Sequence, residues 1–121
     1  MKGLSIIALT ALVAGPVYAG CTAPSSDVTI PDGSKATLDE LLAAKKAVKD
    51  YNAAVEAFNS CLNLEQDAAV AARGNNITQE ERKQIDKDYA DRYNVELAKL
   101  QAVAEQLNTQ IRAYKAAHPS K

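Results

Sequence analysis

The residues of this chain best suited to chemistry are two cysteines, Cys21 and Cys61, and their spacing predicts a disulfide. Cys61 is expected about 24 residues into a helix that starts near Thr37, which places it roughly 36 Å from the helix start. The residues between Cys21 and Thr37 can span up to about 53 Å when extended, enough to bring the two sulfurs together. In an oxidising compartment the bond would close a loop of about 40 residues and stabilise the fold by roughly 4 kcal/mol.

A lipid anchor on Cys21 is the alternative. The segment YAGC, residues 18–21, resembles a bacterial lipobox at its last three positions, but it has Tyr18 where that pattern carries an aliphatic residue. A lipid on Cys21 would also leave Cys61 as an odd thiol in an exported protein. The sequence therefore favours the disulfide and leaves the lipoprotein open, together with free or intermolecular thiols.

No other group of side chains predicts an enzyme. The single histidine, His118, stands beside the last proline, and it cannot by itself build a Ser/His/Asp set, a Cys/His pair or a zinc motif. Acidic residues are dense between Glu80 and Asp91, but basic residues interleave with them, which is typical of a solvated helix face. We therefore expect no catalytic residues, no metal site and no cofactor.

The first 19 residues, MKGLSIIALTALVAGPVYA, have the pattern of a secretory signal peptide. One lysine precedes an apolar run from Leu4 to Ala14, which is too short to span a membrane. Val17 and Ala19 then supply the small residues that a signal peptidase reads. Cleavage after Ala19 would leave a chain that starts at Gly20. A Gram-negative periplasm suits the disulfide-bonded form, and the outer membrane suits the lipoprotein alternative.

The expected mature chain is close to neutral. The sequence has 14 basic and 15 acidic residues, so removal of Lys2 with the signal leaves a formal charge of −2. This balance argues against a nucleic-acid partner and against a polybasic membrane patch. We therefore expect contact with a membrane only if Cys21 carries lipid.

An irregular arm should precede two long helices. Residues 20–36 are rich in Pro, Gly and Ser, which is typical of turns and extended segments. The tetrapeptides TLDE and TQEE, which begin at Thr37 and Thr78, are both capping boxes, and each opens a stretch without interior Gly or Pro. The first stretch stops at Gly74, and the second runs to His118.

The short link after the first helix favours an antiparallel pair, so residues 37–118 are predicted to form an all-α, coiled-coil-like helical hairpin. Each helix carries two apolar stripes at seven-residue spacing. In the first helix they are Leu41, Val48, Val55, Leu62, Ala69 and Ala44, Tyr51, Phe58, Glu65, Ala72; in the second they are Ala90, Leu97, Ala104, Ile111 and Tyr93, Leu100, Leu107, Tyr114. Folding about the link would set Val55 opposite Leu97, and the polar Glu65 and Asp86 predict looser packing near the link.

Further apolar residues flank these stripes. A strip on the first helix consists of Ala47, Ala54, Cys61 and Ala68. The arm could cover this strip with Val28 and Ile30. On the second helix a candidate interaction surface consists of Ile85, Tyr89 and Val103. That surface could pair two copies into a four-helix homodimer, or its members could be scattered apolar side chains, which are common on protein surfaces.

The segments IPDG at 30–33, VKDY at 48–51 and CL at 61–62 resemble those of small exported helical-hairpin proteins of Gram-negative bacteria. The resemblance implies an exported hairpin with an irregular arm, and it implies no activity. Two functions remain: a non-catalytic structural or protein-interaction module of the cell envelope, and a periplasmic holdase-type chaperone. The tip from Arg73 to Asn76 is polar, whereas a chaperone is expected to expose apolar surface there, so we favour the module.

Overall fold

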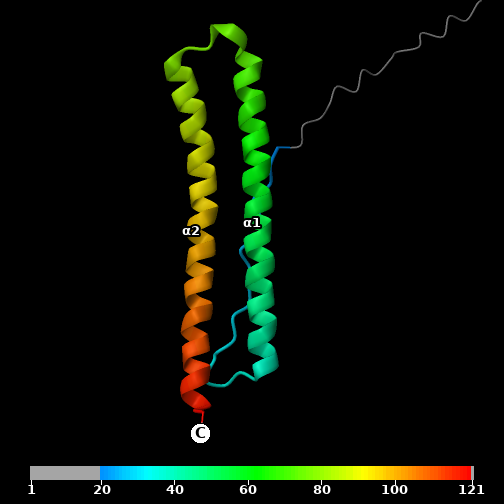
Figure 1. The fold of residues 1–121 in the computed structure, drawn as a ribbon, viewed down its shortest axis with the longest axis vertical. Helices are drawn as coiled ribbons and strands as arrows, with labels where there is room; N and C mark the ends of the chain where they lie inside the picture. The colour runs from blue at the N-terminus through cyan, green and yellow to red at the C-terminus, as the bar shows by residue number, and fades with distance from the viewer. Residues whose placement is uncertain (1–19, 121) are drawn as a thin grey trace, which may run out of the picture.

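A computed structural model describes residues 20–120, so the predicted signal peptide, residues 1–19, lies outside the described residues. Two helices, α1 (Leu38–Arg73) and α2 (Gln79–Ala117), lie antiparallel and are joined through a 3₁₀ turn, η1 (Gly74–Asn76) (Figure 1). Residues 20–120 contain no strand, and the all-α helical hairpin predicted from the sequence is confirmed. Neither described helix is long and apolar enough to cross a membrane.

Both helices begin at the predicted capping boxes. Thr37 Oγ1 accepts the Glu40 N–H at 3.2 Å, and the Glu40 carboxylate accepts the Thr37 N–H at 2.8 Å. Thr78 and Glu81 repeat this exchange at 3.1 and 3.0 Å. At the other end of α1, Gly74 has a φ of +63°, a conformation that ends the helix and that side chains with a Cβ rarely adopt. Local sequence therefore determines where each helix starts and where the chain reverses.

The core is a single seam between the two helices. Helix α1 buries six members of its predicted stripes, and α2 adds two of its own: Leu41, Ala44, Tyr51, Val55, Phe58, Leu62, Leu100 and Leu107. Val55 and Leu62 are each only 1% exposed. No described residue of α1 beyond Leu62 is buried, and Ala90, a predicted stripe member, is not buried either. The seam is therefore well packed toward the open end of the hairpin, where α1 begins and α2 ends, and it is less tightly packed near the tip, where η1 joins the helices.

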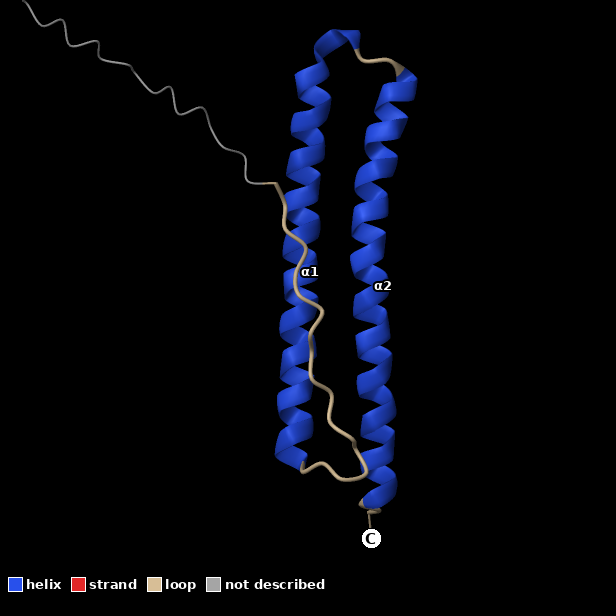
Figure 2. Ribbon diagram, turned by 180° about the vertical axis from the view of Figure 1, so that it is seen from behind, coloured by secondary structure: helices blue, strands red, loops and turns tan. Residues whose placement is uncertain are grey.

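The arm adds a third layer to the hairpin. Figure 2 shows it as an extended loop that runs along α1 toward the open end and crosses to α2 before it enters α1. Midway, Val28 packs against the core cluster of Tyr51, Val55 and Leu100. At the crossing, a Cβ atom on Gly33 would stand 1.8 Å from the carbonyl oxygen of Gln110, so only glycine lets the arm approach α2 this closely.

Candidate functional site

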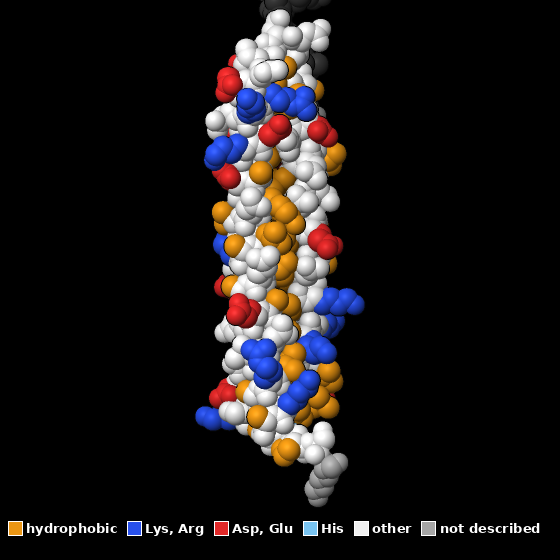
Figure 3. Space-filling view, turned by 60° about the vertical axis from the view of Figure 1, so that its left-hand side comes forward, with side chains coloured by type: hydrophobic (Ala, Val, Ile, Leu, Met, Phe, Trp, Pro, Cys, Tyr) orange, Lys and Arg blue, Asp and Glu red, His pale blue; other side chains and the backbone are white. Residues whose placement is uncertain are grey.

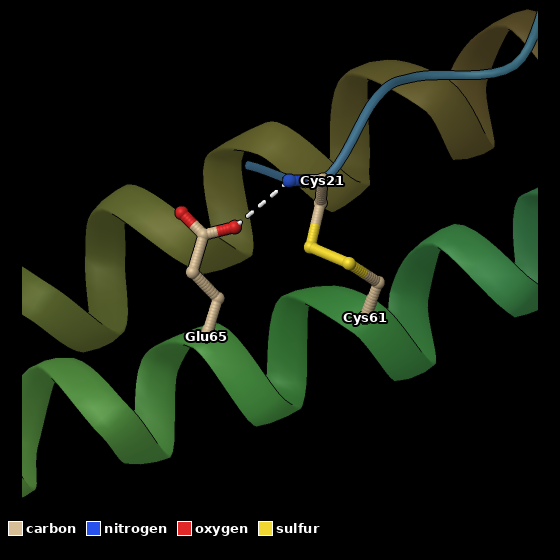
Figure 4. A group of neighbouring side chains, drawn as sticks. All are labelled: Cys21, Cys61 and Glu65. Atoms are coloured by element: carbon tan, nitrogen blue, oxygen red, sulfur yellow. Dashed lines mark hydrogen bonds between the residues drawn. A yellow bond between two sulfur atoms is a disulfide. The ribbon is translucent and has the colours of Figure 1, made fainter. Parts of the chain in front are cut away.

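Cys21 of the arm and Cys61 of α1 form a disulfide, with their Cα atoms 5.8 Å apart (Figure 4). The structure thus makes the pairing that the reach of the arm predicts, and no cysteine among the described residues is free. A lipid on Cys21 would need the same sulfur atom that bonds to Cys61. The disulfide and the lipid-anchored form therefore exclude each other.

Glu65 lies one helical turn after Cys61 and binds the start of the arm. One carboxylate oxygen, Oε2, accepts the Cys21 N–H at 3.1 Å (Figure 4). The other oxygen, Oε1, accepts the hydroxyl of Tyr89 at 3.1 Å and lies 3.3 Å from Nη1 of Arg92. The Cys21 N–H, then Arg92 and Tyr89, lower the pKa of the Glu65 carboxyl. An ionised carboxylate therefore joins the arm to both helices.

Tyr89 and Arg92 complete this junction from the side of α2. Arg92 Nη2 donates to the carbonyl oxygen of Cys21 at 3.4 Å, and the Arg92 guanidinium lies 5.3 Å from the centre of the Tyr89 ring. Burial, and then the hydrogen bond to Glu65, raise the pKa of the Tyr89 hydroxyl, so it remains a donor. We call the five residues Cys21, Cys61, Glu65, Tyr89 and Arg92 the clasp.

The clasp holds the arm against both helices through the disulfide and its hydrogen bonds. Ligand atoms of Cys21, Cys61 and Glu65 lie within 4.8 Å of one another, a spacing that could suit a metal ion. However, the two sulfurs are bonded to each other and offer no thiolate, while Glu65 already accepts bonds from three groups. A hollow of about 480 Å³ beside the disulfide has mainly apolar walls, which include the exposed Leu64.

The predicted interaction surface, Ile85, Tyr89 and Val103, is largely used inside the chain. Tyr89 belongs to the clasp, and Val103 packs against the same core cluster as Val28 of the arm. Ile85 is half-buried. Tyr89 and Val103 lie on the side of α2 that meets the arm, so the arm occupies much of the place that a second copy of the chain would need.

Sequence reasoning missed Glu96, a buried carboxylate that is 4% exposed. Its Oε1 accepts from Lys99 Nζ at 2.9 Å, whereas its Oε2 and the hydroxyl of Tyr51 have no partner among the described residues. Burial, and then the charge of Glu96, raise the pKa of Tyr51. A signal was present: Tyr89, Glu96, Val103 and Gln110 recur every seven residues along the flank that faces the arm.

No protein-family model matches this chain, and no curated protein or solved structure proved similar to it. The resemblance to small exported hairpin proteins therefore stays a prediction. The geometry of the hairpin, the arm and the clasp is the basis on which a function can be assigned.

Proposed function

We propose that this protein is an exported, non-catalytic helical module of the cell envelope, with a structural or protein-binding role. The observation that carries the proposal is the clasp. Its disulfide, carboxylate, phenol and guanidinium are the groups best suited to chemistry, and each of them binds the arm or a residue that binds it. Such a set produces a braced rod rather than a reactive centre.

The arm braces the hairpin at three levels, which supports a structural role. Near the tip it is bonded to Cys61, midway Val28 packs on the core, and at the open end Gly33 N–H donates to Gln110 Oε1 at 2.8 Å. The arm lies along the apolar flanks of both helices. A holdase-type chaperone would use such a groove for its clients, so its occupation by the arm favours the module.

The disulfide also supports export, because such bonds form and persist in oxidising compartments such as the periplasm. It agrees with cleavage after Ala19, which would leave Gly20 as the first residue and Cys21 free to pair with Cys61. The lipid-anchored alternative would release the arm from α1 and leave Cys61 as an odd thiol.

Cell fractionation and intact mass, measured with and without a reductant, test the proposal. We expect periplasmic protein that starts at Gly20 and gains the mass of two hydrogen atoms on reduction. A diacylglycerol adduct on Cys21 would overturn the soluble, disulfide-bonded form. In a separate assay the oxidised protein should not slow the aggregation of an unfolded client; suppression at equimolar ratio would favour the chaperone instead.

A further inference from the structure

Charge is separated along the hairpin, although the chain as a whole is nearly neutral. Residues 29–50 and 99–118, which form the open end together with the crossing of the arm, carry seven basic and five acidic side chains, a formal charge of +2. Residues 51–98, which form the rest of the hairpin, carry five basic and nine acidic side chains, a formal charge of −4. The open end therefore presents a positive field that the net charge conceals.

Helix α1 contributes four exposed residues to one stripe at this end. Leu38, Leu42, Lys45 and Lys49 follow one another at spacings of four, three and four residues, so they stand above one another on the helix. Leu38 is 54% exposed and Leu42 is 49% exposed. Lys45 and Lys49 each lie two residues from Ala47, which lines the cleft beside the arm, so the stripe is on the opposite side of α1.

Helix α2 contributes Arg112 and Lys115, which are three residues apart and both exposed. Arg112 lies two residues from Gln110, which binds the arm, and therefore also faces away from the arm. We call these two residues, with Leu38, Leu42, Lys45 and Lys49, the basic patch. Figure 3, which views the molecule from a side away from the arm, shows Lys and Arg side chains gathered around hydrophobic ones at the open end.

The cations of the patch are not neutralised within the chain. Lys45, Lys49, Arg112 and Lys115 form no ion pair with any described residue, and Arg112 donates only to Thr109 Oγ1, at 3.2 Å. In contrast, every basic residue of 51–98 is paired with a carboxylate: Arg73, Arg82, Lys83, Lys87 and Arg92. Glu105 is the only acidic residue of 99–118. Within the described residues, the cations of the basic patch therefore have no ion-pair partner, and its two leucines remain exposed to solvent.

We propose that the basic patch binds the surface of a membrane that contains anionic phospholipids. Four cations on one face match a layer of phosphate groups, and two exposed leucines can enter the boundary between headgroups and acyl chains. Repulsion of the acidic half, residues 51–98, would direct the tip away from the same surface. This inference deepens the proposed envelope module by naming a partner, and it rests on that proposal for access to a membrane.

Sedimentation with vesicles tests this contact on the oxidised protein as purified after export. We expect binding to vesicles that contain phosphatidylglycerol, little binding to pure phosphatidylcholine, and release by salt. Replacing Lys45, Lys49, Arg112 and Lys115 by Gln should weaken binding about fivefold for each charge removed. The matched control replaces Arg73, Arg82, Lys83 and Lys87 by Gln, which gives the same net charge and should weaken binding far less.

Three outcomes would overturn the inference. These are no binding of the parent, equal losses in the two charge variants, or binding to a soluble polyanion such as heparin but not to vesicles. Leu38→Gln with Leu42→Gln should reduce the binding that remains at high salt, and unchanged binding would refute the insertion of the leucines. Circular dichroism checks that all variants fold. Processed, disulfide-bonded periplasmic protein that ignores vesicles would refute the membrane contact and leave the proposed function standing.

Discussion

Removing the disulfide would measure how much the arm contributes to stability. The double variant Cys21→Ser, Cys61→Ser loses a cross-link between residues 40 positions apart. For a loop of that length the chain-entropy relation gives about 13 cal/mol/K, or about 4 kcal/mol at 25 °C. Small domains are stabilised by only about 5–15 kcal/mol in total, so the variant should lose a large part of its free energy of unfolding.

Urea titration followed by circular dichroism would measure this loss. The oxidised parent should be more stable than the double variant by about 4 kcal/mol, and the reduced parent should match the variant because both lack the bond. The slope of free energy against urea should rise without the cross-link, because the unfolded chain then exposes more surface. An unchanged free energy of unfolding would show that the bond does not stabilise the folded hairpin relative to the unfolded chain, which would refute the role of the arm as a brace.

Three further changes probe the seam, the arm and the clasp. Leu62→Ala should cost about 3 kcal/mol in chemical denaturation because Leu62 is 1% exposed, whereas Leu64→Ala, at a position 73% exposed, should cost under about 0.5 kcal/mol; equal losses would mean that the seam is misplaced. Gly33→Ala should speed hydrogen exchange in the arm and should destabilise the fold more than Gly74→Ala does. Gly74→Ala should cost about 1–3 kcal/mol through its backbone conformation alone, and the reverse order would contradict the close approach of the arm to α2. Folding lowers the pKa of Glu65, so the ionised carboxylate stabilises the fold above the ordinary carboxyl pKa, about 4.3, and this stabilisation is lost as the pH falls through the folded pKa. Glu65→Gln should therefore flatten the acid side of a plot of Tm against pH. Parallel profiles of the parent and the variant would count against the clasp.

The helix ends were predictable because they depend on residues close in the sequence. Thr37 with Glu40, and Thr78 with Glu81, satisfy one another within four residues, so their pattern is enough to locate each helix start. Gly74 ends α1 by its own backbone freedom. The buried members of the seam follow from seven-residue spacing, which two packed helices share.

Other features depend on contacts that the pattern of one helix cannot show. The need for glycine at Gly33 arises from the backbone of Gln110, far along the chain, rather than from the local turn. Tyr89 and Val103 look free when only two helices are counted, and become inward-facing once the arm forms a third layer. The basic patch could not be seen in the sequence for a related reason. Net charge counts every charged residue of the chain, whereas the charge of a surface depends only on residues that are neighbours in space.

The disulfide also determines which part of the chain can carry tension. A pull between Gly20 and the end of α2 passes through the sulfur bridge into α1 at Cys61, so residues 22–60 lie in a covalent ring outside the load path. From Cys61 the force passes along the rest of α1 and through the tip into α2, so the part of α1 at the open end carries no force. The ring hides about 140 Å of contour length, because an extended chain spans about 3.3–3.6 Å per residue. In single-molecule stretching that length should appear only after the bond is reduced, so the same bond would set both the stiffness and the reach of the rod.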